Sequence, residues 1–527
     1  KGAVEDVCRP LNSYKLIRVY PNNNETLQYL NALYKESTLY DLDFWQPPTK
    51  IGAVVELTVG PRDAPVFLRD LEAKELHYTV TLNDLQQAIE NEKSTPVFLH
   101  SEPDGYSYDK YHSLDEIYEE MLRLRRKNPN IISLIDIGES HENRSLLVIK
   151  ISTKRRSEIE KKVAFWIDAG IHAREWIAPA TAMYIVHELV HGYDNGISIR
   201  RILDHIDFYI LPVMNPDGYE YSRLKNRMWR KNRRPYNCKH QRFHSGCCTG
   251  VDLNRNFDWF WSSAGSSTDP CHDTYPGLKA FSEAETVAVR DYLQANKPEA
   301  FITLHSYSQM WLIPYGHRKR SYPQDYHTAL IRFSSLSVSG FSFIDEASGG
   351  SHDWAKGSLQ VRYAYLIELR PKSGTTGYGF LLPEREISAT GLETFEAIKV
   401  VAEEMVEQFV EPSTKRRVRL TTKQIPRSFG YTVSNTFHKW TNKTSSKETS
   451  AASPAIIKTT SSLKNNKVSG ESWNTSTKPA SNIRDVNRRT ICVDQGSYCR
   501  LFSILNLCDR KSLLSMCAGT CHQSCRP

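Results

Sequence analysis

The chain has 527 residues, of which 40% are hydrophobic and 24% charged, and its formal net charge is +8. A chain of this length exceeds what a single hydrophobic core normally supports, so we expect several domains. No apolar run reaches the length of a membrane span, and no motif is typical of nucleic-acid binding, so we expect neither kind of protein.

Four apolar segments in the middle of the chain have the length and composition of buried strands. They cover residues 163–167, 206–211, 300–304 and 363–367, and helix-like segments alternate with them. This alternation predicts an α/β domain. Because ligands of open α/β sheets bind outside the carboxyl ends of the strands, we expect the side chains at those ends to converge.

A candidate metal-binding turn follows the first of these strands. Residues Gly170–Trp176 carry His172 and Glu175, three positions apart, and His305 directly follows the third strand segment. Catalytic zinc sites commonly use three protein ligands of this kind and keep a fourth position for water. The three residues are therefore candidate zinc ligands. A His-x-x-Glu pair also arises by chance, and His305 could be an ordinary strand-end histidine.

Seven short motifs lie in order between Gly170 and Pro383. They are GIHAREWIAP at 170–179, NPDG at 215–218, RMWRK at 227–231, DLNRN at 252–256, HSYSQ at 305–309, ELR at 368–370 and YGFLLP at 378–383. This collinear set resembles the zinc carboxypeptidases of the carboxypeptidase A and B family. The resemblance implies a zinc metallocarboxypeptidase with one zinc ion per chain and a mixed eight-stranded sheet flanked by helices.

The resemblance also implies roles in the hydrolysis of a C-terminal peptide bond. Zinc would activate a water molecule and polarise the scissile carbonyl, and Glu368 would act as the general base. Arg230 would stabilise the oxyanion, while Asn254 and Arg255 would bind the free carboxylate of the substrate. Arg174 and Tyr307 would make two further contacts with the substrate. Asp252 would be the carboxylate that orients a zinc-bound histidine. On the residues alone, Glu368 could instead be a buried salt-bridge partner of Arg370.

A second metal motif competes with this interpretation. Residues His187–His191 read His-Glu-Leu-Val-His and fit the H-E-x-x-H pattern of a different class of metalloprotease. The residues that follow, Gly192–Asn195, lack the extension of the metzincins, and no third ligand is evident. Residues 180–186 also read as the helix that packs behind the zinc turn in the carboxypeptidases. We therefore interpret the second motif as a coincidence.

Two positions in the loop 344–354 depart from the family pattern. Asp345 stands where the family usually has the tyrosine of a mobile lid, and an ionised carboxylate there would repel the substrate carboxylate unless a base paired with it. His352 stands where an apolar residue gives A-type and an acidic residue gives B-type preference. A histidine could accept polar or acidic side chains when protonated, or stack on aromatic ones when neutral. Cleavage of C-terminal Lys or Arg is the least expected.

The resemblance extends to the N-terminal part of the chain. Residues 1–95 resemble the activation segment of the family, a small α/β domain that covers the active-site cleft, and residues 105–412 would form the catalytic domain. The chain would then be a zymogen, with a candidate cleavage site near Lys93 and Ser94. A domain that only assists folding is the alternative.

The C-terminal part has a different composition. Residues 413–490 contain 26 Ser or Thr among 78 residues, which is typical of a solvated linker without a packed core. Six cysteines lie in the last 36 residues, so residues 491–527 are predicted to form a disulfide-stapled mini-domain. Their spacing resembles the ShK toxin-like domain, as in secreted nematode enzymes, which implies three pairs: Cys492–Cys525, Cys499–Cys517 and Cys508–Cys521.

Five more cysteines lie before the linker. The family pattern pairs Cys248 with Cys271, and Cys238 with Cys247 could close an inserted loop. Cys8 is left over in this scheme, so it could carry a free thiol or form an intermolecular disulfide.

Cysteine usage and four N-glycosylation sequons, at Asn24, Asn143, Asn442 and Asn474, predict a secreted, extracellular glycoprotein. The chain begins at Lys1 without a signal peptide, which suggests a mature or trimmed secreted form. Residues 413–527 hold 20 Lys or Arg against 5 Asp or Glu, so this tail could bind an anionic extracellular matrix. We expect an enzyme that acts on peptide or protein C-termini. A matrix-binding or cuticle-organising protein with the same fold and little turnover is the alternative.

Overall fold

The computed structural model of the chain describes residues 11–92, 105–154, 162–235, 248–326, 346–375 and 377–410. All of these ranges belong to one compact unit. Several predicted features lie outside the described residues: Cys8, the joint at Lys93 and Ser94, the Cys238–Cys247 pair, Asp345, the linker 413–490 and the C-terminal mini-domain with its three predicted disulfides.

The N-terminal domain is an antiparallel four-stranded sheet in the order β2-β3-β1-β4, combined with helices, as predicted. Alternating apolar side chains of the strands, such as Ile17 and Val19, pack with helical residues such as Leu30 and Leu71. The elements are β1 (Lys15–Tyr20), α1 (Asn24–Lys35), the 3₁₀ turn η1 (Ser37–Leu39), β2 (Leu42–Gln46), β3 (Val55–Val59), α2 (Ala64–Ala73), β4 (His77–Leu82) and α3 (Leu85–Glu92).

The second domain is built on a seven-stranded sheet in the order β10-β11-β9-β7-β8-β6-β5. Its strands are β5 (Ile132–Glu139), β6 (Ser145–Ile151), β7 (Val163–Ala169), β8 (Ile206–Leu211), β9 (Ala300–Ser308), β10 (Met310–Leu312) and β11 (Tyr363–Lys372). Its helices and short turns are α4 (Leu114–Lys127), α5 (Ile177–Asn195), α6 (Ile197–His205), α7 (Pro216–Leu224), η3 (Leu253–Arg255), α8 (Ala284–Ala295), α10 (Ser351–Gly357), η5 (Glu384–Glu386), α11 (Ile387–Met405) and η6 (Val406–Val410).

The four strands predicted from apolar runs form the parallel centre of this sheet. β11 pairs with β9, β9 with β7, and β7 with β8, all in parallel, whereas β10, β6 and β5 add in antiparallel fashion. The sheet is therefore mixed, as predicted, but the described residues give it seven strands rather than eight. An eighth strand could be added only at the edges β10 or β5, because every strand between them already pairs on both sides, and no described segment pairs there.

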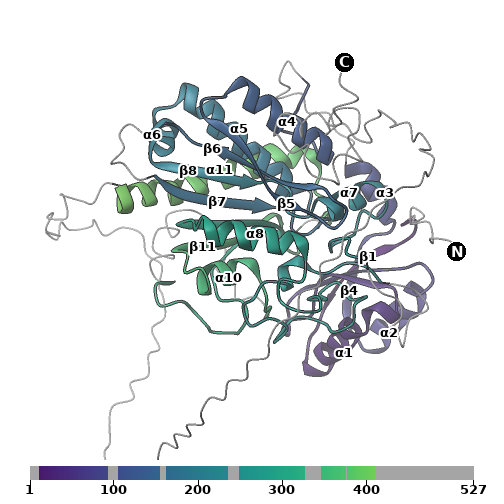
Figure 1. Ribbon diagram of the computed structural model, residues 1–527. Coiled ribbons are helices and arrows are strands. Elements are labelled where there is room, and N and C mark those ends of the chain that lie inside the picture. Colours follow the sequence, from purple (N-terminus) through teal and green to yellow (C-terminus); the bar gives the residue numbers. More distant parts are fainter. Residues whose placement is uncertain are drawn as a thin grey trace, which may run out of the picture. The chain divides into compact units, whose positions relative to one another are not determined.

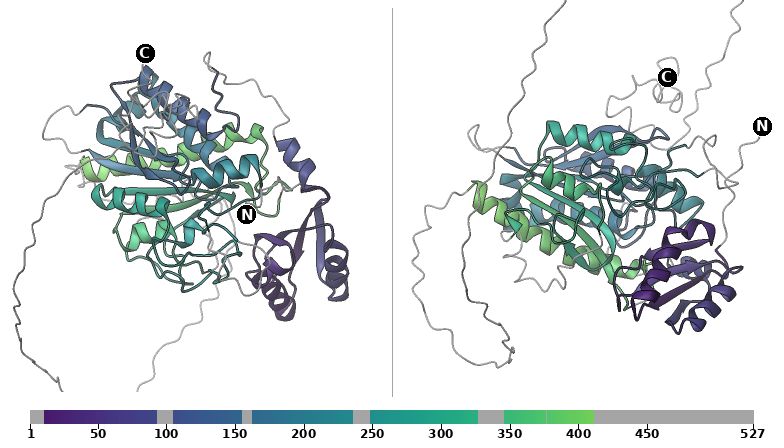
Figure 2. Two further views of the ribbon diagram at one scale, coloured as in Figure 1. Left: turned by 45° about the vertical axis from the view of Figure 1, so that its right-hand side comes forward. Right: turned by 90° about the horizontal axis from the view of Figure 1, so that it is seen from below.

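Helices cover both faces of the seven-stranded sheet, with α5 and α11 on one side and α8 and α10 on the other (Figure 1). The turned views show the same layers (Figure 2). Successive residues of β7 explain why both faces are covered: Phe165 and Ile167 pack in the cluster with α5 and α11, while Trp166 packs with α8 and α10. Within the described ranges, no helix combines the length and apolarity needed to cross a membrane.

Candidate active site

The predicted metal turn begins directly after β7, at Gly170. Its φ is +65°, and a Cβ there would lie 3.0 Å from Pro179 Cγ and 3.4 Å from Val213 Cα. Glycine adopts this backbone conformation readily, whereas other residues are strained in it. The chain can therefore turn sharply at the carboxyl end of β7 and enter α5 within seven residues, which places His172 and Glu175 at the edge of the sheet.

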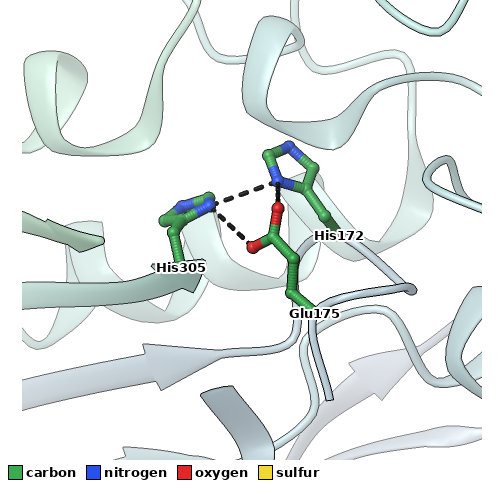
Figure 3. A group of neighbouring side chains, drawn as sticks. All are labelled: His172, Glu175 and His305. Atoms are coloured by element: carbon green, nitrogen blue, oxygen red, sulfur yellow. Dashed lines mark hydrogen bonds and ion pairs between the residues drawn. The ribbon is translucent and has the colours of Figure 1, made fainter. Parts of the chain in front are cut away.

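His172, Glu175 and His305 converge at this edge (Figure 3). Oxygen atoms of Glu175 lie 2.7 Å from His172 Nδ1 and 3.2 Å from His305 Nδ1, and the two Nδ1 atoms are 3.2 Å apart. All three side chains are buried. The sequence prediction that brings these residues together from the turn and from β9 is thus matched by the geometry.

The outer ring nitrogens of both histidines have their own partners. His172 Nε2 lies 3.2 Å from Asp252 Oδ1, and His305 Nε2 lies 3.2 Å from Thr303 Oγ1. Such partners fix the ring orientation and leave the inner nitrogens as lone-pair donors. The Nδ1 atoms that face each other are therefore suited to a shared cation.

The protonation states also fit a zinc ion. Burial lowers the pKa of His305 to about 4, which keeps the imidazole neutral at physiological pH. Burial opposes ionisation of Glu175, but its electrostatic interactions and hydrogen bonds with His172 and His305 outweigh burial and lower the pKa of this carboxyl group. Neutral imidazole and ionised carboxylate are the forms that bind Zn²⁺, so these residues fit the metal.

Asp252 connects the metal group to two arginines. Its Oδ2 accepts hydrogen bonds from Arg230 Nη2 and Nε at 2.9 and 3.2 Å and lies 3.9 Å from Arg255 Nη1. Burial would raise the pKa of Asp252, but Arg230, Arg255 and His172 lower it well below its usual range. One ionised carboxylate thus positions the metal turn and both guanidinium groups.

Glu368 lies on β11 opposite His305 of β9, since their Cα atoms are partners in the parallel register. Its side chain is half-buried, and its Oε2 atom is buried without a hydrogen-bond partner. Burial, together with the negative charge of Glu175, raises the pKa of Glu368 well above its usual range. The salt bridge to Arg370 considered from the sequence does not form, because that guanidinium binds Glu386 and Glu393.

The predicted carboxylate-binding residues follow Asp252 in the turn η3. Asp252 Oδ1 accepts the N–H of Asn254 at 2.9 Å, and Asn254 Oδ1 in turn accepts the N–H of Ser351 at 3.0 Å. Because its oxygen is used in this way, Asn254 keeps its amino group as the available donor. Arg255 donates from Nε to the carbonyl of Gly265 at 2.9 Å, which anchors one edge of the guanidinium.

The two predicted outer substrate contacts are occupied by acids of the N-terminal domain. Arg174 Nη1 lies 2.9 Å from Asp43 Oδ1, and Tyr307 donates its hydroxyl hydrogen bond to Glu56. Arg18 of the N-terminal domain also binds Glu56 through its guanidinium. No sequence pattern indicates the partners of Asp43 or Glu56, because such contacts depend on how the folded domains meet.

The rival H-E-x-x-H motif lies on α5, and its two histidines stack on each other with ring centroids 5.8 Å apart. His187 also contacts the ring of Tyr108 at 4.2 Å. Among the described residues, neither histidine belongs to a group that could hold a metal ion. The segment is a packing helix behind the metal turn, as interpreted from the sequence.

A second His/Glu group does occur, formed by His141, Glu283 and Glu285. Asn232 already binds both carboxylates of this group, because its Nδ2 donates to Glu283 Oε2 at 2.9 Å and to Glu285 Oε2 at 3.1 Å. His141 Nε2 lies 3.0 Å from the same Glu283 oxygen. This group is therefore a hydrogen-bonded network between α8 and the loop after β5.

Sequence reasoning missed two residues that shape the metal group. Thr303 binds His305 from two positions earlier on the same face of β9, and the N–H of Ser306 donates to Glu175 Oε2 at 3.1 Å. The period of two along a strand could have indicated Thr303. The Ser306 contact involves only backbone and carries no sequence signal. The structure also contains the Cys248–Cys271 disulfide that the resemblance implied.

A buried His/His/Glu group at the carboxyl ends of parallel strands, beside a carboxylate whose Oε2 atom has no partner, is typical of a metal-dependent hydrolase. Comparisons with known proteins then give the family. The family model described as zinc carboxypeptidase matches residues 117–397, and the one described as carboxypeptidase activation peptide matches residues 17–92. The chain belongs to the zinc carboxypeptidase family and carries that family's activation peptide ahead of its enzyme domain.

Individual relatives agree with this assignment. Carboxypeptidase A2 of Rattus norvegicus is 37% identical over 405 residues, which span 74% of this chain and 93% of that protein. Carboxypeptidase B of Rattus norvegicus is 34% identical over 404 residues, spanning 73% and 92%. The crystal structure of thrombin activatable fibrinolysis inhibitor matches with a TM-score of 0.64 at 32% identity, covering 75% of this chain and 99% of that chain. The protein is thus a zinc-dependent carboxypeptidase with a propeptide, and relatives of both the A and the B type match it.

Proposed function

We propose that the chain is a secreted zymogen that, once activated, removes C-terminal residues from peptides or extracellular proteins, with Glu368 as general base. The observation that carries this proposal is the position of Glu368, a half-buried carboxylate in register with His305 whose buried Oε2 atom has no hydrogen bond. A carboxylate is costly in such surroundings unless it serves a function, since it lacks the partners that normally compensate burial.

His172, Glu175 and His305 would hold the metal. Zinc, when bound, polarises the scissile carbonyl and lowers the pKa of a water molecule. Glu368 would take the proton of the attacking water on Oε2 and return it to the nitrogen of the leaving residue. Because the Oε2 atom of Glu368 is buried, little bulk water competes for this proton transfer.

Arg230 would stabilise the negative charge that develops on the carbonyl oxygen. Asp252 holds its Nε and Nη2, so the guanidinium is fixed while donors on Nη1 remain for the reacting group. A preorganised cation costs no reorganisation at the moment of reaction.

Arg255 and the amino group of Asn254 would bind the free carboxylate of the substrate. A guanidinium matches a carboxylate in planar, two-point fashion. Such a clamp admits only chain ends, which is the physical basis for an exopeptidase.

The N-terminal domain would keep the enzyme inactive until a protease separates the two domains. Asp43 and Glu56 occupy Arg174 and Tyr307, the residues expected to contact the substrate beyond the cleaved bond. Secretion is supported by the Cys248–Cys271 disulfide, since such bonds persist in oxidising compartments. The basic tail, residues 413–527, would bind anionic extracellular matrix.

The test is to cleave the full chain by limited proteolysis and to assay N-blocked dipeptides with varied C-terminal residues, with and without a chelator. We expect chelator-sensitive release of the C-terminal residue. Glu368→Gln should lower kcat by about 10³-fold while zinc content stays at one ion per chain. Absence of release from every dipeptide would contradict the proposal and favour the matrix-binding alternative, and loss of zinc on His187→Ala would show that the ligands are wrongly assigned.

A further inference from the structure

His352 lies in the first turn of α10, next to the residues proposed to bind the substrate carboxylate. Its ring is buried, and a Cβ placed on Gly350 would be 3.5 Å from His352 Nδ1 and 3.7 Å from Asn254 Oδ1. Gly350 therefore lies between the ring of His352 and the side chain of Asn254, in van der Waals range of both. A terminal residue whose carboxylate is held by Asn254 and Arg255 would place its side chain beside this ring.

Asp353 decides which ring nitrogen of His352 carries the proton. His352 Nε2 lies 3.3 Å from Asp353 Oδ1, and the two oxygens of Asp353 also accept N–H bonds from Gly316 at 2.9 Å and from His317 at 3.0 Å. A lone pair on Nε2 would be repelled by this acceptor, so the proton belongs on Nε2. His352 Nδ1 is then a hydrogen-bond acceptor.

That acceptor has no partner. His352 Nδ1 is buried without a hydrogen bond. Burial lowers the pKa of His352, and the positive charge of Arg255 acts in the same direction against the effect of Asp353, so the ring is neutral at physiological pH. An unpaired buried acceptor is destabilising, and a hydrogen-bond donor supplied by the substrate would remove this cost.

Building on the proposed function, we infer that the activated enzyme prefers C-terminal residues whose side chains donate a hydrogen bond without carrying charge, with glutamine and asparagine as the matching amides. An aliphatic side chain would leave Nδ1 desolvated and unpaired. A carboxylate offers no donor and would face a neutral ring backed by Asp353. A lysine or arginine would bring a positive charge that needs a carboxylate partner. Asp353, the carboxylate beside the ring, already accepts two backbone N–H groups and contacts His352.

The experiment compares N-blocked dipeptides ending in Gln, Met, Glu and Lys with the proteolytically activated full chain. Gln and Met have the same length, and only Gln donates hydrogen bonds. We expect kcat/KM for Gln to exceed that for Met by about ten-fold or more, and Glu and Lys to be poor substrates. His352→Leu should lower the ratio of kcat/KM for Gln to kcat/KM for Met to one or less. His191→Leu, a control on α5, should leave this ratio unchanged.

A binding measurement keeps the inference separate from turnover. In the Glu368→Gln background, calorimetry should give a Kd for the Gln dipeptide that rises about ten-fold on His352→Leu, while the Kd for the Met dipeptide stays the same or falls. Thermal unfolding and zinc content verify that each variant is folded. Preference for Met, Glu or Lys over Gln, or a ratio that is insensitive to His352→Leu, would overturn the inference. If no dipeptide is turned over, the proposed function fails, and the calorimetric comparison still decides the preference.

Discussion

Among the single residues of the site, Asp252 contacts functional groups of different kinds. One carboxylate contacts His172 on Oδ1 and Arg230 on Oδ2, with Arg255 close by. The same ion therefore orients a metal ligand and both cations proposed to bind substrate. Its replacement should change metal affinity and substrate positioning together.

Asp252→Asn tests this dual role. The amide keeps the shape but loses the charge, so we expect zinc affinity to fall about 10–100-fold, since partners of metal-bound histidines have effects of this size. Competition with a chromophoric chelator measures the zinc Kd. Asp258→Asn, an exposed neighbour in the same segment, is the matched control and should leave the Kd unchanged. An unaltered Kd in Asp252→Asn would show that His172 is oriented without this contact.

Glu368 and His352 differ in what the sequence could reveal about them. Motif order indicated Glu368 as the base, and its register with His305 supports that assignment. At His352 the sequence left open a protonated or a neutral ring. Only the contact with Asp353 and the burial of Nδ1 choose between these states, because they depend on residues brought together from the loop at Gly316 and from α10.

At the scale of elements, apolar patterning predicted what depends on local sequence. The four parallel strands are continuous apolar runs because helices cover both faces, and such runs are recognisable without an alignment. The short edge strand β10 has three residues and no comparable pattern. Edge strands and their number depend on pairing partners, which explains why the described residues give seven strands instead of the predicted eight.

The helix α8 carries a charge network whose energetics depend on pH. Burial, together with the negative charges of Asp217 and Glu283, raises the pKa of Glu285 from 4.5 to about 7, although His141 opposes this shift. The folded state therefore binds this proton more tightly than the unfolded chain. Below pH 4.5 both states are protonated and no penalty exists, whereas above pH 7 the buried carboxylate is ionised and its full cost is present.

Glu285→Gln should remove this penalty. The amide resembles the protonated acid, so its stability advantage over the unmodified chain should grow between pH 4.5 and 7 and level off at about 3 kcal/mol above that range. Urea denaturation at a series of pH values measures the difference. Asp291→Asn on the exposed side of α8 is the control, and a difference that does not change with pH would mean that the pKa of Glu285 is not raised in the folded state.

At the scale of the whole molecule, three acids of the N-terminal domain bind three residues of the enzyme domain. Asp43 holds Arg174, Glu56 holds Tyr307, and Glu92 pairs with Arg227 through two short contacts of 2.6 and 2.8 Å. Arg227 also donates to the carbonyls of Arg174 and Phe380. The residues expected to contact substrate are thus used for contact between domains before activation.

Replacing two of these acids should weaken the contact between the N-terminal domain and the enzyme domain. In the uncleaved Asp43→Asn/Glu56→Gln variant, both residues keep their shape but lose the charge that holds Arg174 and Tyr307. Charge-assisted hydrogen bonds contribute about 1.5–3 kcal/mol each, so we expect uncleaved chain to hydrolyse a small blocked dipeptide at least about ten-fold faster than the unmodified zymogen. Initial rates before any proteolysis measure this effect.

The control for this variant is Asp70→Asn/Glu72→Gln, because these exposed acids bind Tyr29 and Tyr78 within the N-terminal domain and should not change the basal rate. Full proteolytic activation supplies a second control, since Asp43 and Glu56 leave with the released domain and all variants should reach the same kcat/KM. If the uncleaved double variant is as inert as the unmodified zymogen, contacts other than these two charges keep substrate out. The buried pair of Arg227 with Glu92, the last residue of α3, would then be the next contact to remove.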